Sequence, residues 1–220
     1  MKANITFKRV FGVFLGVILL GLGVAFFNQA GLGQDSLAAL CFSLNYLINE
    51  SWSYGIFYFG VNFIFFILML IFLREHIFIG TIVSLVLTGL ISSQFMYLFN
   101  YIGFIPQNLI IRILVGFLGI VNIALGIAFY GGAKLGISPY DSLPLIICKY
   151  FPKFKYKFVR IAMDLTCLSI AIIIGLIILN RKDVVGVFTI LSLILSGPLI
   201  SLFSKLFNKI YYKDTEATFS

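Results

Sequence analysis

Long apolar runs recur along the chain. Five runs carry no charged residue, and a sixth contains Arg160 and Asp164. The six runs cover residues 10–34, 51–73, 77–99, 113–133, 158–180 and 184–204. The hydrocarbon core of a bilayer is about 30 Å thick and a helix rises about 1.5 Å per residue, so a span needs roughly 20 apolar residues. The runs are continuously apolar, whereas the strands of a membrane β-barrel alternate apolar and polar residues. We therefore predict an all-α polytopic membrane protein with six transmembrane helices.

The composition agrees with a membrane environment. Of the 220 residues, 61% are hydrophobic and only 11% are charged, which leaves too few polar side chains to cover a water-soluble globule. The net charge of +8 is better explained by topology and by contact with anionic lipid headgroups than by nucleic acid, which we do not expect as a partner. With a cytoplasmic N-terminus and six spans, every Lys and Arg falls on the cytoplasmic side except Arg112, Arg181 and Lys182. We therefore expect both termini in the cytoplasm.

The N-terminal segment has one feature of a secretory signal peptide, since Lys2, Lys8 and Arg9 precede an apolar run. The run is long for a signal peptide, and a similar segment recurs in the middle of the chain. We expect the segment to be retained as the first span.

The chain repeats itself at an offset of about 103 to 108 residues. The matching dipeptides of the first span are Leu15-Gly16, Leu22-Gly23 and Ala25-Phe26, which recur as Leu118-Gly119, Leu125-Gly126 and Ala128-Phe129. We expect one membrane domain, 1–207, made of two three-span repeats at about 8–100 and 112–207, followed by a short cytoplasmic tail, 208–220.

A short apolar segment follows the first span of each repeat. The segments cover residues 35–48 and 141–150, and each begins with an Asp, a residue that favours the start of a helix. As helices they reach only about 21 and 15 Å, too short to cross a bilayer, so we predict re-entrant half-helices. Each repeat then has an odd number of spans, and the two repeats are inverted relative to each other, as in many secondary transporters. An eight-span parallel arrangement also satisfies the charge rule and remains the alternative.

The connectors of the two halves resemble a known family. Residues 29–37 (QAGLGQDSL) and especially 133–143 (AKLGISPYDSL) are similar to the motif A-G-L-G-x-S-P-W-D-x-L of the YczE/YyaS/YitT family of bacterial membrane proteins. Residues 79–81 (IGT) and 196–199 (SGPL) fit two further segments of that family. The first connector lacks the S-P-aromatic triplet, and the second has Tyr140 in place of Trp. The resemblance implies a multi-pass protein of the bacterial cytoplasmic membrane and no particular function.

Polar residues inside the predicted spans are candidates for a solute site, because a buried polar group needs a partner. Asp164 lies one helical turn beyond Arg160, so the pair forms either a cation site or a structural ion pair. Asn62 occupies the corresponding position of the first half, where it either completes this site or bonds to a neighbouring helix.

The starts of the two half-helices are the second candidate site. Asp35 and Asp141 are either N-caps or ligands. Beside them Gly33, Gly136 and Ser138 bring helix-start N–H groups to the same place, which suits a solute that carries charge.

A permease or secondary transporter of an unidentified small solute is the function these features favour. The alternative is a non-transporting membrane partner, such as an assembly or regulatory factor. The sequence has no P-loop, nucleophile elbow or His/Cys metal-ligand spacing, so we expect neither an enzyme nor a bound metal or other cofactor.

Overall fold

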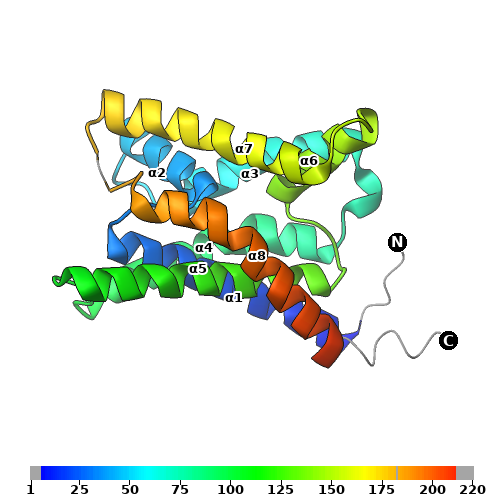
Figure 1. Ribbon diagram of the computed structural model, residues 1–220, viewed down its shortest axis with the longest axis horizontal. Coiled ribbons are helices and arrows are strands. Elements are labelled where there is room, and N and C mark those ends of the chain that lie inside the picture. Colours follow the sequence, from blue (N-terminus) through cyan, green and yellow to red (C-terminus); the bar gives the residue numbers. More distant parts are fainter. Residues whose placement is uncertain (1–5, 182, 212–220) are drawn as a thin grey trace.

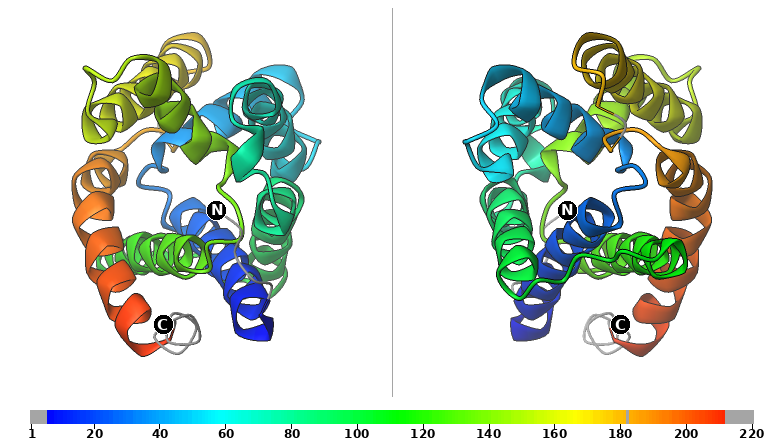
Figure 2. Two further views of the ribbon diagram at one scale, coloured as in Figure 1. Left: turned by 90° about the vertical axis from the view of Figure 1, so that its right-hand side faces the viewer. Right: turned by 90° about the vertical axis from the view of Figure 1, so that its left-hand side faces the viewer.

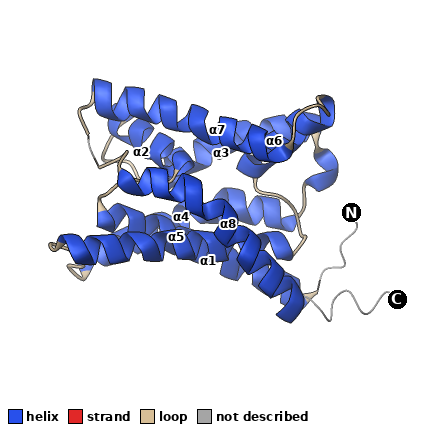
Figure 3. Ribbon diagram, viewed as in Figure 1, coloured by secondary structure: helices blue, strands red, loops and turns tan. Residues whose placement is uncertain are grey.

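The computed structural model describes residues 6–181 and 183–211, and all regular structure within them is helical (Figures 1 and 3). The eight α-helices are α1 (Phe7–Ala30), α2 (Ser36–Ile48), α3 (Tyr54–Phe72), α4 (Ile79–Tyr101), α5 (Leu109–Gly132), α6 (Pro139–Tyr150), α7 (Tyr156–Ala171) and α8 (Val187–Ile210). A 3-10 turn (Arg74–His76) precedes α4, and a π-helical stretch (Ile172–Ile178) continues α7.

Six helices, counting α7 with its π-helical continuation as one, are long and apolar enough to cross a membrane. This confirms the prediction of an all-helical protein with six long apolar helices and is consistent with a polytopic membrane protein. The fifth span covers Tyr156–Ile178 and includes Asp164. Helix α8 ends at Ile210, so residues 208–210 of the predicted tail are helical, while residues 212–220 lie outside the described part.

Helices α1 and α5 cross at the base of the bundle, with α4 beside α1 and α8 beside α5 (Figure 2). Glycines allow their backbones to touch. A Cβ atom on Gly16 would lie 2.8 Å from the carbonyl oxygen of Gly126, and one on Gly23 would lie 2.9 Å from that of Gly119. Because the glycines meet in reversed order, the two helices run antiparallel. Small residues of this kind let membrane helices pack at close range.

The remaining helices form a second layer above this one, in which α2 contacts α3 and α7, and α6 contacts the same two helices (Figure 1). Helix α2 begins in the interior and ends near the α7–α8 turn, where Glu50 pairs with Arg181 at 2.7 Å. Helix α6 begins in the interior and ends at the opposite end of the molecule, where Lys149 pairs with Glu75 at 3.1 Å. The N-terminal ends of both short helices therefore face each other in the middle of the protein.

The connectors that lead into α2 and α6 are held by backbone hydrogen bonds. Phe188 donates its N–H to the carbonyl of Leu32 at 3.0 Å, and Gly80 donates its N–H to that of Leu135 at 2.8 Å. Gly33 and Gly136 have φ angles of 109° and 123°, which other L-residues rarely adopt. A Cβ on Gly33 would lie 2.5 Å from Oγ1 of Thr189, and one on Gly136 would lie 2.6 Å from Oγ1 of Thr81. Glycine is thus required at both turns for conformation and for space.

Candidate functional site

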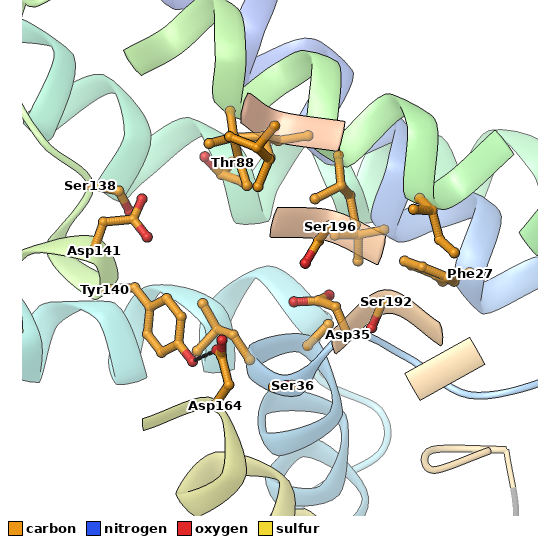
Figure 4. Close-up of a pocket in the computed structure, with 18 of the residues that line it drawn as sticks. Phe27, Asp35, Ser36, Thr88, Ser138, Tyr140, Asp141, Asp164, Ser192 and Ser196 are labelled. Carbon is orange, nitrogen blue, oxygen red and sulfur yellow. Dashed lines mark hydrogen bonds between the residues drawn. The ribbon is translucent and has the colours of Figure 1, made fainter. Parts of the chain in front are cut away.

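A cavity of about 110 Å³ lies at the centre of the molecule, where α2 and α6 begin (Figure 4). Each of the eight helices, or the residue at its start, contributes to the wall. The apolar part of the wall comes mostly from α1 and α5, with Leu20, Val24 and Phe27 facing Ile120, Ile123 and Ile127. The polar part comes from the starts of α2 and α6, from Tyr130 of α5, and from α3, α4, α7 and α8. A partly apolar cavity with a few convergent polar groups is the usual form of a small-molecule site.

Four ionisable residues of the wall carry formal charge: Asp35, Asp141, Arg160 and Asp164. Arg160 of α7 donates from Nη1 to Oδ1 of Asp141 and from Nε to Oδ2 of Asp164 at 3.3 Å. The hydroxyl of Tyr140 donates to the other oxygen of Asp164 at 2.5 Å, and its ring lies under the Arg160 guanidinium at 4.8 Å. The three charged side chains are each about a quarter exposed. The group links α6 to α7 at one side of the cavity.

Asp35 stands apart from this cluster. It lies at the N-cap position of α2, and its side chain makes no capping hydrogen bond. Its Oδ1 atom is buried and has no hydrogen-bond partner among the described residues. In Figure 4 the carboxylate points into the cavity, beside Ser192 and Ser196 of α8 and on the opposite side from Asp141. The structure thus separates Asp35, which has no ion pair among the described residues, from Asp141 and Asp164, which share the guanidinium of Arg160.

Hydroxyl groups complete the polar wall. Tyr54 and Tyr58 of α3, Thr88 of α4, and Ser192 and Ser196 of α8 all line the cavity. These residues were not among the predicted site residues. The sequence does hold a signal for them, because Ser and Thr recur every three or four residues along both helices, at 81, 84, 88 and 92 and at 189, 192 and 196. Such spacing places the hydroxyls on one helix face.

Five of the eight predicted site residues line this one cavity: Asp35, Ser138, Asp141, Arg160 and Asp164. Gly33 and Gly136 are not lining residues and instead form the tight turns against Thr189 and Thr81. Asn62 is buried on α3 away from the cavity lining, and its amide donates to the Tyr58 carbonyl at 3.0 Å.

The expectation that Asp141 caps a helix is wrong. Helix α6 begins two residues earlier than predicted, at Pro139, with Ser138 at the N-cap. Proline is favoured at the first position of a helix, where its missing N–H has no partner to lose. Asp141 therefore lies inside the first turn, free to reach Arg160. Asp35 does occupy the N-cap position, as predicted, although it forms no capping bond.

The charges outside the cavity lie at the ends of the bundle. The Lys149 ammonium hydrogen-bonds to the exposed carboxylate of Glu75 and lowers the pKa of Glu75 below its ordinary value. His76 is adjacent, 3.9 Å from the same carboxylate. Within the described residues no three His, Cys, Asp or Glu side chains gather closely enough to hold a metal ion.

Comparison with known proteins agrees with the resemblance seen in the motifs. A family model described as "Family of unknown function (DUF6198)" matches residues 7–205. The "Uncharacterized protein YyaS" of Bacillus subtilis (strain 168) is 29% identical over 193 residues, which cover 86% of this chain and 89% of that protein. No solved structure matches the chain.

Proposed function

The chain belongs to the DUF6198 family of unknown function, and from its geometry we propose that it is a secondary transporter of a small solute in the bacterial cytoplasmic membrane. The observation that carries the proposal is the central cavity, to whose wall all eight helices contribute and which is lined by four side chains with a formal charge. Ionisable groups at such a depth in a membrane protein are costly, and they typically mark a solute or ion pathway.

Paired contacts support two halves in inverted orientation. In the repeat, Gly16 corresponds to Gly119 and Gly23 corresponds to Gly126. The contact of Gly16 with Gly126 therefore recurs, with the two helices exchanged, as the contact of Gly23 with Gly119, and α1 and α5 run antiparallel. An eight-span parallel duplication would make these helices parallel. The Phe188–Leu32 and Gly80–Leu135 backbone bonds pair each connector with the last span of the other half. An approximate two-fold axis through the cavity accounts for all of these contacts.

The lengths and ends of α2 and α6 support re-entrant half-helices. They have 13 and 12 residues, so they extend about 20 and 18 Å, less than a bilayer core. Each returns toward the end of the molecule from which its chain segment came (Figure 1). Half-helices that meet near the midplane form the solute sites of several inverted-repeat transporters, in which the halves rock about the site to expose it to either side.

The distribution of basic residues supports cytoplasmic termini. One end of the bundle holds Lys149, Lys153, Lys155 and Lys157, together with the start of α1 and the end of α8. Arg112 and Arg181 lie at the other end. The positive-inside rule assigns the lysine-rich end to the cytoplasm, where it contacts anionic lipid. Catalysis, a cofactor and nucleic acid have no part in this proposal.

Reconstitution tests the proposal. Purified protein in liposomes is screened for uptake of small solutes, and each active solute is repeated with the cavity variants Asp141→Asn and Asp164→Asn. Glu50→Gln and Glu75→Gln, which remove a carboxylate at either end of the bundle, serve as controls. We expect solute-dependent flux in the wild type and the controls, with a loss of at least tenfold in the cavity variants. Absence of flux and of ligand-induced stabilisation across a broad library would instead favour a non-transporting membrane partner.

A further inference from the structure

We propose that the ligand of the central cavity is a small monovalent cation of the ammonium class, held by the carboxylate of Asp35 against an aromatic wall. This inference rests on the proposed function only in taking the cavity as the solute site. It adds the charge and the chemical class of the solute.

The first argument is the balance of charge. The cavity is lined by three carboxylates and one guanidinium. Arg160 contacts Asp141 and Asp164 and neutralises one of them. Asp35 has no cationic partner of its own among the described residues. The Oδ1 atom of Asp35 is buried and has no hydrogen-bond partner among the described residues. A buried charge that is not paired with an opposite charge is costly, so an entering cation is stabilised and an entering anion is repelled.

The second argument is that hydrogen-bonding capacity in the wall is unused. Oδ1 of Asp35 is a buried acceptor without a partner. The hydroxyl of Tyr54 is also buried and unpartnered within the described part of the chain, on a side chain that is only 5% exposed. Both groups line the same cavity. Ser192 and Ser196 add hydroxyl oxygens beside Asp35 (Figure 4). This set offers acceptors to the N–H groups of an alkylammonium ion.

The third argument is the aromatic character of the wall. Phe27, Tyr54, Tyr58 and Tyr140 line the cavity, and the Tyr54 and Tyr58 rings lie 5.9 Å apart. Aromatic faces attract organic ammonium ions, more strongly where water is excluded. Tyr140 already binds a cation in this way, since Arg160 lies over its ring. Phe42 stacks on one face of the Tyr54 ring at 4.4 Å, so the part of the aromatic wall formed by α3 consists of Tyr58 and the other side of Tyr54.

The size of the cavity and the coordination that it offers limit the chemical class of the solute further. An apolar cavity of about 150 Å³ can hold benzene, so about 110 Å³ suits a solute of a few non-hydrogen atoms. A divalent metal ion takes six to eight oxygen ligands or a near-ideal octahedron, and within the described residues no carboxylates converge in that way. A small organic monovalent cation fits both limits.

Binding is measured first. Wild-type protein in detergent, in a buffer whose other cation is bulky N-methylglucamine, is titrated with methylammonium chloride while its unfolding temperature is followed. The N-methylglucamine salt of lactate is the anionic comparison, and urea is the neutral one. We expect saturable stabilisation by methylammonium and at least a tenfold weaker apparent affinity in Asp35→Asn. Asparagine is nearly isosteric and as good an N-cap as aspartate, so α2 is retained. Glu50→Gln and Glu75→Gln should bind like the wild type.

Two results would overturn the inference. One is stabilisation of the wild type by lactate or urea without any by methylammonium. The other is equal binding of methylammonium by wild type and Asp35→Asn, which includes the absence of binding in both. If the cavity only takes up protons, acid stabilises the protein but methylammonium binds neither the wild type nor Asp35→Asn. That outcome also overturns the inference.

Transport is measured separately on proteoliposomes adsorbed to a solid-supported membrane, where currents report translocated charge. Saturable binding of methylammonium without a methylammonium current would support the cation site and contradict the proposed transport function. A current that is driven by an anion would support the proposed transport function and contradict the cation site.

Discussion

At the residue scale, the crossing of α1 and α5 leaves no room for a side chain at Gly16, where a Cβ would lie 2.8 Å from the backbone of Gly126. We predict that Gly16→Ala lowers protein stability by about 1 to 3 kcal/mol, because the helices must separate. Gly60→Ala on α3 has nothing within 4 Å of the new Cβ and should be neutral or stabilising by up to about 1 kcal/mol. The free energy of unfolding in detergent is measured for both variants. Equal changes in stability would contradict the close crossing of α1 and α5.

The ionic cluster of the cavity makes a second prediction at this scale. Arg160→Gln leaves Asp141 and Asp164 without their cation, and we expect a loss of about 2 to 3 kcal/mol of stability. The triple variant Arg160→Gln/Asp141→Asn/Asp164→Asn removes the stranded charges and should recover most of that loss. Unfolding of the two variants in one detergent decides the matter. A triple variant less stable than Arg160→Gln would mean that the cluster stabilises through packing and not through charge compensation.

At the element scale, the end of α1 depends on a side chain from another helix. Arg112, at the start of α5, donates from Nε to the carbonyl of Ala30 at 2.6 Å and from Nη2 to that of Gly31 at 2.7 Å. These carbonyls have no partner within α1, because the last turn of a helix leaves its acceptors free. Helix α1 ends at Ala30 with its C-cap at Gly31, which has a left-handed conformation, and the guanidinium of Arg112 binds the carbonyls at this end, where the connector to Asp35 begins.

We predict that Arg112→Gln lowers stability by roughly 2 to 4 kcal/mol, since two hydrogen bonds from a charged group are lost. Arg181→Gln at the same end is the matched control. It removes an exposed ion pair with Glu50 and should cost less than about 1 kcal/mol. Thermal unfolding of both variants provides the comparison. If the two substitutions had the same effect, Arg112 would not be the cap of α1.

At the scale of the whole molecule, the sequence was sufficient for much of the architecture. Apolar runs of bilayer length predict the six long helices, because length and hydropathy alone decide whether a segment can span. The repeated glycines of the first and fourth spans lie at the crossing of α1 and α5, a contact that the sequence pattern alone does not predict. The predicted start of α6 at Asp141 is wrong, because Ser138 and Pro139 together provide a stronger start signal than Asp141.

The candidate site was only partly predictable. Charged residues in apolar runs are rare, so Arg160 and Asp164 stand out in the sequence, and the Gly-Asp connectors mark Asp35. The sequence does not reveal which charged side chains form ion pairs with one another within the site. Arg160 reaches across from α7 to Asp141 of α6, a contact set by packing between helices. Ser196 does not stand out in the sequence because a serine hydroxyl in a membrane helix can bond to its own backbone and needs no site.

The inverted arrangement of the two halves is the claim on which both the site and the transport function depend. Single cysteines at Gln107 and Lys153, both exposed, are introduced after Cys41, Cys148 and Cys167 are replaced by alanine. An impermeant thiol reagent is then applied to intact cells and to inverted vesicles. The six-span inverted arrangement predicts that residue 107 is labelled from outside and residue 153 from the cytoplasm. Labelling of both from the cytoplasm is the result of an eight-span parallel duplication and would contradict the account.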